Sequence, residues 1–255
     1  MPELKQRIAR QFSRAATMYD RFADIQADIA FDALSLLPGC DGTLLDIGCG
    51  TSRYAKQLLS KCSHMLGVDL AYGMLSQARD SVSNADWICA DAEDLPLAAQ
   101  SVNGVFSSMA LQWCSSAEQA MLECARVMRP GARGTLAIMS AGSFTELHKC
   151  RQMIDGQLLG NRFFDSQHWH SAAEKAGLRT ASHTRAYTSW HPDILSLLNS
   201  IRHIGASTLT QTDHRPLNRR SLLRLEHEYE QHFAKNGRLP LTYNVTFLQV
   251  IKNHE

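Results

Sequence analysis

Residues 44–50 read Leu-Leu-Asp-Ile-Gly-Cys-Gly, an apolar run that brings an acid and two glycines to the point where a strand turns into a helix. Glycine lets the backbone approach a ligand closely, and the first N–H groups of the following helix are free to bind it. A dinucleotide fingerprint needs glycine at the first, third and sixth positions from Gly48, but the sixth is Arg53. The stretch therefore predicts a cofactor-binding turn that is not built for nicotinamide or flavin dinucleotides. The alternative is a glycine turn that only packs a helix on a strand.

Polar residues follow the next three apolar runs. The run 65–68 stops at Asp69, whose carboxylate can accept hydrogen bonds from both hydroxyls of a ribose. The run 87–89 is followed by Asp91, and 102–106 ends at Ser107-Ser108-Met109. A single Asp after a strand is commonly a helix cap or turn residue, but three strand ends with this spacing favour one shared cofactor site.

The composition is that of a globular chain with one core. With 255 residues and 44% hydrophobic residues, we expect a single domain over 1–255, with covering helices in 1–37, a cofactor-binding half in 40–140 and acceptor-side elements in 141–255. Seven cysteines without a C-x-x-C pair predict reduced thiols, no metal site and a cytoplasmic protein. Cys49 is explained better by its small size in a tight turn than as a nucleophile. We expect no secretory signal and no membrane span.

Charge is unevenly distributed. The net charge of +1 argues against a general nucleic-acid surface. Residues 1–161 hold 14 basic and 17 acidic side chains, whereas 162–255 hold 12 and 8. This asymmetry is consistent with an acidic partner for the second part, with solvated surface charge as the competing explanation.

Strands and helices alternate from residue 43 to about 139, which predicts an α/β fold of Rossmann-like type with a mostly parallel, doubly wound sheet. Two helices are expected in 1–37, before the break at Pro38-Gly39. The predicted helices are 52–61, 72–81, 116–128, 143–159, 167–176, 193–204 and 219–233, and later strands are predicted at 135–139, 179–190 and 241–250.

The pattern D-x-G-x-G at Asp46, Gly48 and Gly50 resembles motif I of class I S-adenosylmethionine-dependent methyltransferases, although Ser52 replaces the usual third glycine. Residues 91–96 resemble that family's adenine loop. The resemblance implies a seven-stranded sheet with an antiparallel final strand and S-adenosylmethionine as cofactor. It also implies that Asp91 binds the adenine amine and the Ala92 N–H a ring nitrogen. The remaining cofactor-binding residues expected from it are Asp46, Gly48, Gly50, Asp69, Leu70, Ser108 and Met109, with Tyr19 from the N-terminal helices.

A narrower resemblance covers nearly the whole chain. The segments 12–26, 111–114, 161–163, 190–206 and 239–243 resemble the malonyl-[acyl-carrier protein] O-methyltransferases of biotin synthesis. Arg133-Gly134 departs from that family's usual glycine pair. The resemblance implies transfer of methyl to a malonyl carboxylate, which is already ionised at pH 7 and needs no general base. We therefore expect catalysis by positioning and water exclusion.

Five residues are candidates for the acceptor side. Tyr19 offers an aromatic face to a sulfonium, with an ordinary core aromatic as the alternative. Arg162 is the first choice for holding the malonyl carboxylate through its planar fork, and Arg202 is the second, with a surface ion pair as the alternative for either. Phe163, together with Trp190, is expected either to wall the acceptor pocket or simply to pack in the core.

The expected partner is a malonyl-acyl carrier protein with an acidic helical surface. Arg215, Arg219, Arg220 and Arg224 lie in or before a predicted helix and form a basic cluster that could steer such a partner; a solvated basic face is the competing account. Two other functions stay open from the sequence: methylation of a free small molecule, and a non-catalytic module that binds adenosylmethionine. An NAD-dependent oxidoreductase is the outside alternative.

Overall fold

The computed structural model describes residues 3–155, 163–203 and 218–254. Seven strands form one sheet in the order β3-β2-β1-β4-β5-β7-β6. The strands β1 (Thr43–Ile47), β2 (His64–Asp69), β3 (Ala85–Cys89), β4 (Val102–Ser108) and β5 (Met128–Met139) are parallel. The strand β7 (Leu239–Lys252) runs antiparallel to both β5 and β6 (Leu178–His191). The expected mostly parallel sheet with an antiparallel final strand is confirmed.

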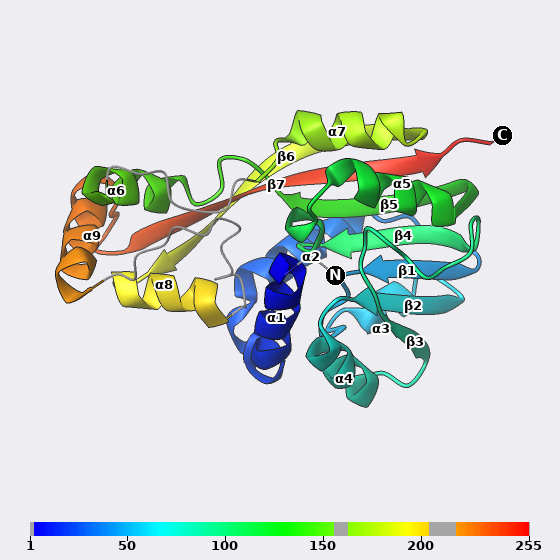
Figure 1. The fold of residues 1–255 in the computed structure, drawn as a ribbon, viewed down its shortest axis with the longest axis horizontal. Helices are drawn as coiled ribbons and strands as arrows, with labels where there is room; N and C mark the ends of the chain where they lie inside the picture. The colour runs from blue at the N-terminus through cyan, green and yellow to red at the C-terminus, as the bar shows by residue number, and fades with distance from the viewer. Residues whose placement is uncertain (1–2, 156–162, 204–217, 255) are drawn as a thin grey trace.

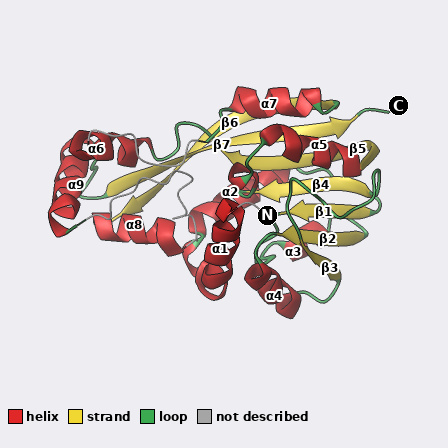
Figure 2. Cartoon of the chain, viewed as in Figure 1, coloured by secondary structure: helices red, strands yellow, loops and turns green. Residues whose placement is uncertain are grey.

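Helices cover both faces of this sheet (Figure 2). Their bounds are α2 (Asp24–Leu36), α3 (Ala55–Leu59), α4 (Tyr72–Ser81), α5 (Ala117–Val127) and α7 (Ser166–Lys175). Consecutive strand residues point to opposite faces, so Val105 of β4 packs in one core cluster with α5 and α7, whereas Phe106 packs in a second with α2 and α3. Both faces of the parallel strands are therefore buried.

The last two strands extend well beyond the parallel sheet. β6 and β7 have 14 residues each and pair along their whole length, so at ~3.3 Å per residue they form a ribbon about 45 Å long. Helices α6 (Thr145–Asp155), α8 (Ile194–His203) and α9 (Arg219–His232) pack at the far end of this ribbon (Figure 1). Helix α1 (Glu3–Phe22) lies between that end and the parallel sheet, and contacts both α4 and α8.

Two element boundaries differ from the sequence-based expectation. The helix expected from residue 52 begins only at Ala55, because Ser52 has a φ of 57°, which an α-helix does not accept. The sequence predicts a helix over 116–128 and a strand only from residue 135, but α5 ends at Val127 and β5 already begins at Met128, so that Arg129-Pro130-Gly131 belongs to the strand. The pairing of β4 with β5 shifts register between Val102 and Gly104, and this irregular start accommodates proline and a glycine with a φ of 79°.

Among the described helices, none has the length and apolar character needed to cross a membrane.

Candidate active site

The candidate site lies where the strand order reverses, at the carboxyl ends of β1 and β4. In an open parallel sheet, neighbouring loops leave in opposite directions at this point and open a crevice for ligands. Three hollows meet there, and Tyr19 and Met109 line all of them. The largest encloses about 760 Å³ counted with its open mouth.

Asp69 lines the largest hollow and is held by two backbone N–H groups. Its carboxylate accepts the Gly50 N–H at 2.9 Å on one oxygen and the Ala71 N–H at 2.7 Å on the other. Burial raises the pKa of Asp69, and the N–H groups of Ala71 and Gly50 oppose that shift. Each oxygen keeps a further acceptor position, so the carboxylate is fixed in place and still able to bind two ribose hydroxyls.

The glycine turn supplies the adjoining wall. Gly48 and Gly50 have φ values of 73° and 56°, in the region that favours glycine. A side chain at Gly50 would project into open space, whereas at Gly48 it would collide with Ala110. Ser52, at the family's usual third glycine, keeps a left-handed φ of 57°. The backbone therefore holds the glycine geometry despite the substitution, and leaves a cradle at Gly50 that a Cβ would fill.

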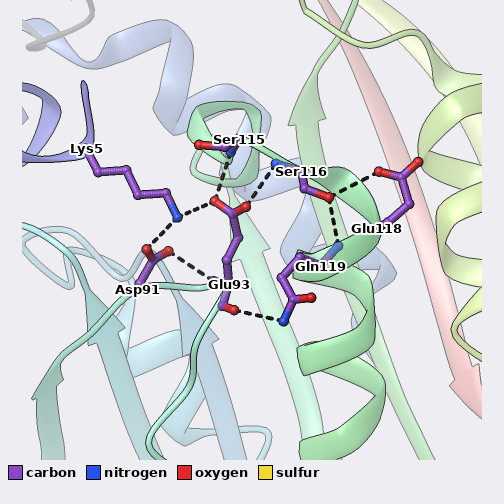
Figure 3. A network of polar contacts seen from close by, with 7 residues as sticks. All are labelled: Lys5, Asp91, Glu93, Ser115, Ser116, Glu118 and Gln119. Atoms are coloured by element: carbon purple, nitrogen blue, oxygen red, sulfur yellow. Dashed lines mark hydrogen bonds and ion pairs between the residues drawn. The ribbon is translucent and has the colours of Figure 1, made fainter. Parts of the chain in front are cut away.

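The loop after β3 is fastened to helix α1 by a polar network (Figure 3). The Lys5 ammonium lies 2.5 Å from an Asp91 carboxylate oxygen and also pairs with Glu93. Burial lowers the pKa of Lys5, but the two carboxylates outweigh it and leave the pKa raised. Glu93 also accepts the N–H groups of Ser115 and Ser116 at 2.8 and 2.9 Å, which ties the loop to the start of α5. Asp91 and Ala92 line the largest hollow, as expected.

The remaining expected cofactor residues also face these hollows. Leu70 and Ser108 line the largest one, together with Ile8 and Phe12 from α1. Phe12 packs edge-on against Trp113, with ring centroids 5.7 Å apart. Helix α1 therefore forms an apolar cover over the carboxyl ends of the strands.

A second hollow adjoins the glycine turn and contains Asp46. Burial, with a smaller contribution from the charge of Asp69, raises the pKa of Asp46 to about 8. Burial likewise raises the pKa of the Cys49 thiol far above its usual range, which leaves a poor nucleophile at pH 7. The expected structural role of Cys49 agrees with this environment. Asp46, with Asp20 across the same hollow, makes this side suited to a cationic group.

A third, smaller hollow extends from Tyr19 and Met109 away from the glycine turn. Its walls are aromatic, thioether and amide side chains, and no ionisable acid or base other than tyrosine lines it among the described residues: Phe12, Tyr19, Gln26, Met109, Gln112, Trp113, Met139, Phe144 and Tyr243. Such a hollow can take an organic group out of water beside the first two.

Among the described residues, the acceptor-side candidates other than Tyr19 do not line these hollows. Arg162 lies outside the described residues, and Arg202 is exposed on α8. Phe163 packs edge-on against Phe144, at 6.3 Å between ring centroids, just behind the third hollow. Trp190 is 36% exposed on β6. Of the basic cluster, Arg215 lies outside the described residues, and Arg219, Arg220 and Arg224 are exposed on α9.

Sequence reasoning missed Lys5, Glu93 and the two glutamines of the third hollow. The role of Lys5 could have been found from its spacing to Ile8 and Phe12, because residues three and four apart share a helix face. A lysine on an apolar stripe that is only 6% exposed needs a buried acidic partner.

Comparison with known proteins identifies the family of the chain. Residues 45–136 match the model of a methyltransferase domain. The malonyl-[acyl-carrier protein] O-methyltransferase of Salmonella typhimurium is 34% identical over 97% of both chains. The biotin biosynthesis bifunctional protein BioHC of Cellvibrio japonicus is 35% identical over 97% of this chain, which spans only half of that longer protein. A putative methyltransferase from Bacillus halodurans shares the fold, with a TM-score of 0.65 at 16% identity over 89% of this chain and 100% of the other.

Proposed function

We propose that this chain, which belongs to the malonyl-[acyl-carrier protein] O-methyltransferase family, esterifies the free carboxylate of a malonyl group on acyl carrier protein, using S-adenosylmethionine, early in biotin synthesis. The observation that carries the proposal is the fixed Asp69 carboxylate under the α1 cover, in a hollow that adjoins an aromatic one at Tyr19 and Met109. Similarity over nearly all of the chain to a named enzyme of this activity supports the choice of acceptor.

The described residues fit the cofactor. Asp69 would hold the ribose hydroxyls, Asp91 and the Ala92 N–H the adenine edge, and Asp46 the methionine ammonium, while Gly50 leaves room for the ligand. S-adenosylmethionine supplies an activated methyl group on a positively charged sulfur. We place that methyl group near Tyr19 and Met109, because these two residues border all three hollows.

The protein's own contribution is alignment and exclusion of water. A malonyl carboxylate is ionised at neutral pH, so no side chain has to remove a proton. The negative charge of the nucleophile and the positive charge of the sulfonium both disappear as the methyl group moves, and water would stabilise the charged reactants more than the transition state. The aromatic cover from α1 and the walls around Tyr19 shield this region, and the face of Tyr19 tolerates the cation.

The basic residues of α9 are the proposed contact for the carrier protein. Arg219, Arg220 and Arg224 are exposed at the far end of the β6–β7 ribbon, where a charged surface can attract an acidic partner. The seven free cysteines are compatible with the reducing cytoplasm, where we propose that the enzyme works.

The test is transfer of labelled methyl to three acceptors: malonyl-carrier protein, malonyl-coenzyme A and free malonate. We expect both thioesters to be methylated, with the highest kcat/KM for the carrier-linked one, and malonate to be the poorest acceptor. Binding of S-adenosylmethionine without methyl transfer to any malonyl compound would refute the proposed activity.

A further inference from the structure

Gln26 is a buried amide whose hydrogen bonding is incomplete. It lies on α2, is 7% exposed, and lines both the hollow of Asp46 and the aromatic hollow beyond it. Its Oε1 atom has no hydrogen-bond partner among the described residues. Buried polar atoms almost always find partners, and leaving one without a partner costs free energy. The position of Gln26 therefore points to a polar group of a ligand.

Gln112 presents a second amide to the same aromatic hollow. It belongs to the short helix η1 (Leu111–Trp113), and its Nε2 donates to the Met109 carbonyl at 2.6 Å. That bond holds a residue whose φ of 57° is unusual for methionine. Gln112 Oε1 is also buried without a partner among the described residues. Two amides from distant parts of the chain therefore border one small space.

The hollow has the position of an acceptor head-group site. It shares Phe12 and Trp113 with the adenosine side and Gln26 with the methionine side, so a group bound in it would reach the point where the hollows meet. A malonyl head group held there would present its carboxylate to that point, and the thioester arm would leave through the mouth.

We propose that Gln26 binds the malonyl carboxylate through its amide N–H₂ group, in the hollow that Gln112 also borders; the inference rests on the methyl transfer proposed above. A half-turn about the last side-chain bond presents either the oxygen or the N–H₂ group of an amide, and no described hydrogen bond to Oε1 prevents this turn in Gln26. One carboxylate oxygen would accept from the amide, and the other would attack the methyl carbon as the carbon–sulfur bond breaks, its electron pair staying on sulfur.

A neutral donor suits this reaction better than an arginine. A guanidinium forms its strongest bonds with the full negative charge of the reactant carboxylate, and that charge is lost in the transition state. A neutral amide orients the carboxylate and stabilises the reactant less. No arginine or lysine lines this hollow within the described part of the chain. Gln26 therefore holds the malonyl carboxylate in place of Arg162, for which the sequence suggested this role.

The variant Gln26→Met keeps the length of the side chain and removes its hydrogen bonds. We expect kcat/KM with malonyl-coenzyme A to fall about 10- to 100-fold, the range for a lost hydrogen bond to a charged group, while the Kd for S-adenosylmethionine changes less than threefold. Gln26→Glu should lose more, because its carboxylate repels the acceptor. The matched control is Gln57→Met, an exposed glutamine on α3, which should behave as the wild type.

A second readout separates recognition from packing. The wild type should bind malonyl-coenzyme A more tightly than propionyl-coenzyme A, which lacks the carboxylate, and Gln26→Met should lose most of this preference. A Gln26→Met variant that keeps both the preference for malonyl-coenzyme A and the wild-type rate would overturn the inference. The inference would also be overturned if Arg162→Ala lost both properties and Gln26→Met kept them. If circular dichroism shows that Gln26→Met does not fold, Gln26→Glu carries the same comparison. Failure of the wild type to methylate any malonyl thioester would instead refute the proposed function.

Discussion

Replacing Lys5 by Met should loosen the cover of the cofactor site. The Lys5 side chain is 8% exposed, and its ammonium pairs with Asp91 and Glu93, which are 21% and 9% exposed. Removing one partner of a fully buried ion pair costs ~3–5 kcal/mol. Glu93 keeps two backbone N–H donors and Asp91 is partly solvated, so we expect Lys5→Met to lower the free energy of unfolding by about 2–3 kcal/mol.

The same change should weaken cofactor binding. Lys5 fixes the carboxylate of Asp91 and anchors the helix that carries Ile8, Phe12 and Tyr19 over the largest hollow. The apparent Kd for S-adenosylmethionine rises by the factor by which the population of the closed position of α1 falls. We expect this rise to be about tenfold.

Urea denaturation and calorimetric titration measure these two effects. Arg7→Met is the matched control, because Arg7 is exposed on the same helix, and its free energy of unfolding should stay within about 0.5 kcal/mol of the wild type. The double variant Lys5→Met/Glu93→Gln should recover part of the lost stability, because it leaves one fewer unpaired charge. Wild-type stability and cofactor affinity in Lys5→Met would refute the reasoning.

Three further predictions concern the cofactor and the partner. Asp69→Ala should weaken binding of S-adenosylmethionine by about 1–3 kcal/mol in calorimetry, and unchanged affinity in a folded variant would remove Asp69 from the site. Because the pKa of Asp46 is raised to about 8, its carboxyl is protonated at pH 6.5, and pairing with the methionine ammonium should release close to one proton; titration in buffers of different ionisation enthalpy measures this, and Asp46→Asn should release none. Charge reversal at Arg219 and Arg220 should slow methylation of the carrier-linked substrate at low salt but not of malonyl-coenzyme A, and an equal loss with both would exclude a steering role.

The sequence predicted best what is local or strictly periodic. The apolar runs before Asp46, Asp69 and Asp91 predict three strands. Because these strands are parallel, their carboxyl ends lie at the same edge of the sheet. The late start of α3 was not predicted, because the residue type serine does not indicate the left-handed φ that Ser52 adopts. The start of β5 escaped because Pro130 and Gly131 ordinarily separate elements, whereas here they lie at an irregular strand end.

The sequence predicted which residues gather at the carboxyl ends of the strands and that the helices of 1–37 cover them, but it did not predict how that cover is attached. Asp69 and Gly50 are 19 positions apart in the sequence, but each lies at the carboxyl end of a strand, so the topology of the parallel sheet brings them together. Lys5 meets Asp91 across 86 positions, and Gln26 shares its hollow with Gln112 only because α2 and η1 pack over the same strand ends. Such contacts depend on how helices dock, which neither periodicity nor capping determines.

The position of β7 between β5 and β6 has a consequence for how the chain reaches its native state. The five parallel strands precede it, and β6 is made before it, yet β6 has no neighbour in the sheet until residues 239–252 have been synthesised. Until then the open edge of β5 offers unpaired backbone groups to other chains. Pairing of β5 with β7 joins residues more than 100 positions apart, which slows folding. We therefore expect the nascent chain to depend on chaperones late in synthesis, and truncation inside β7 to detach the β6 ribbon rather than merely shorten it.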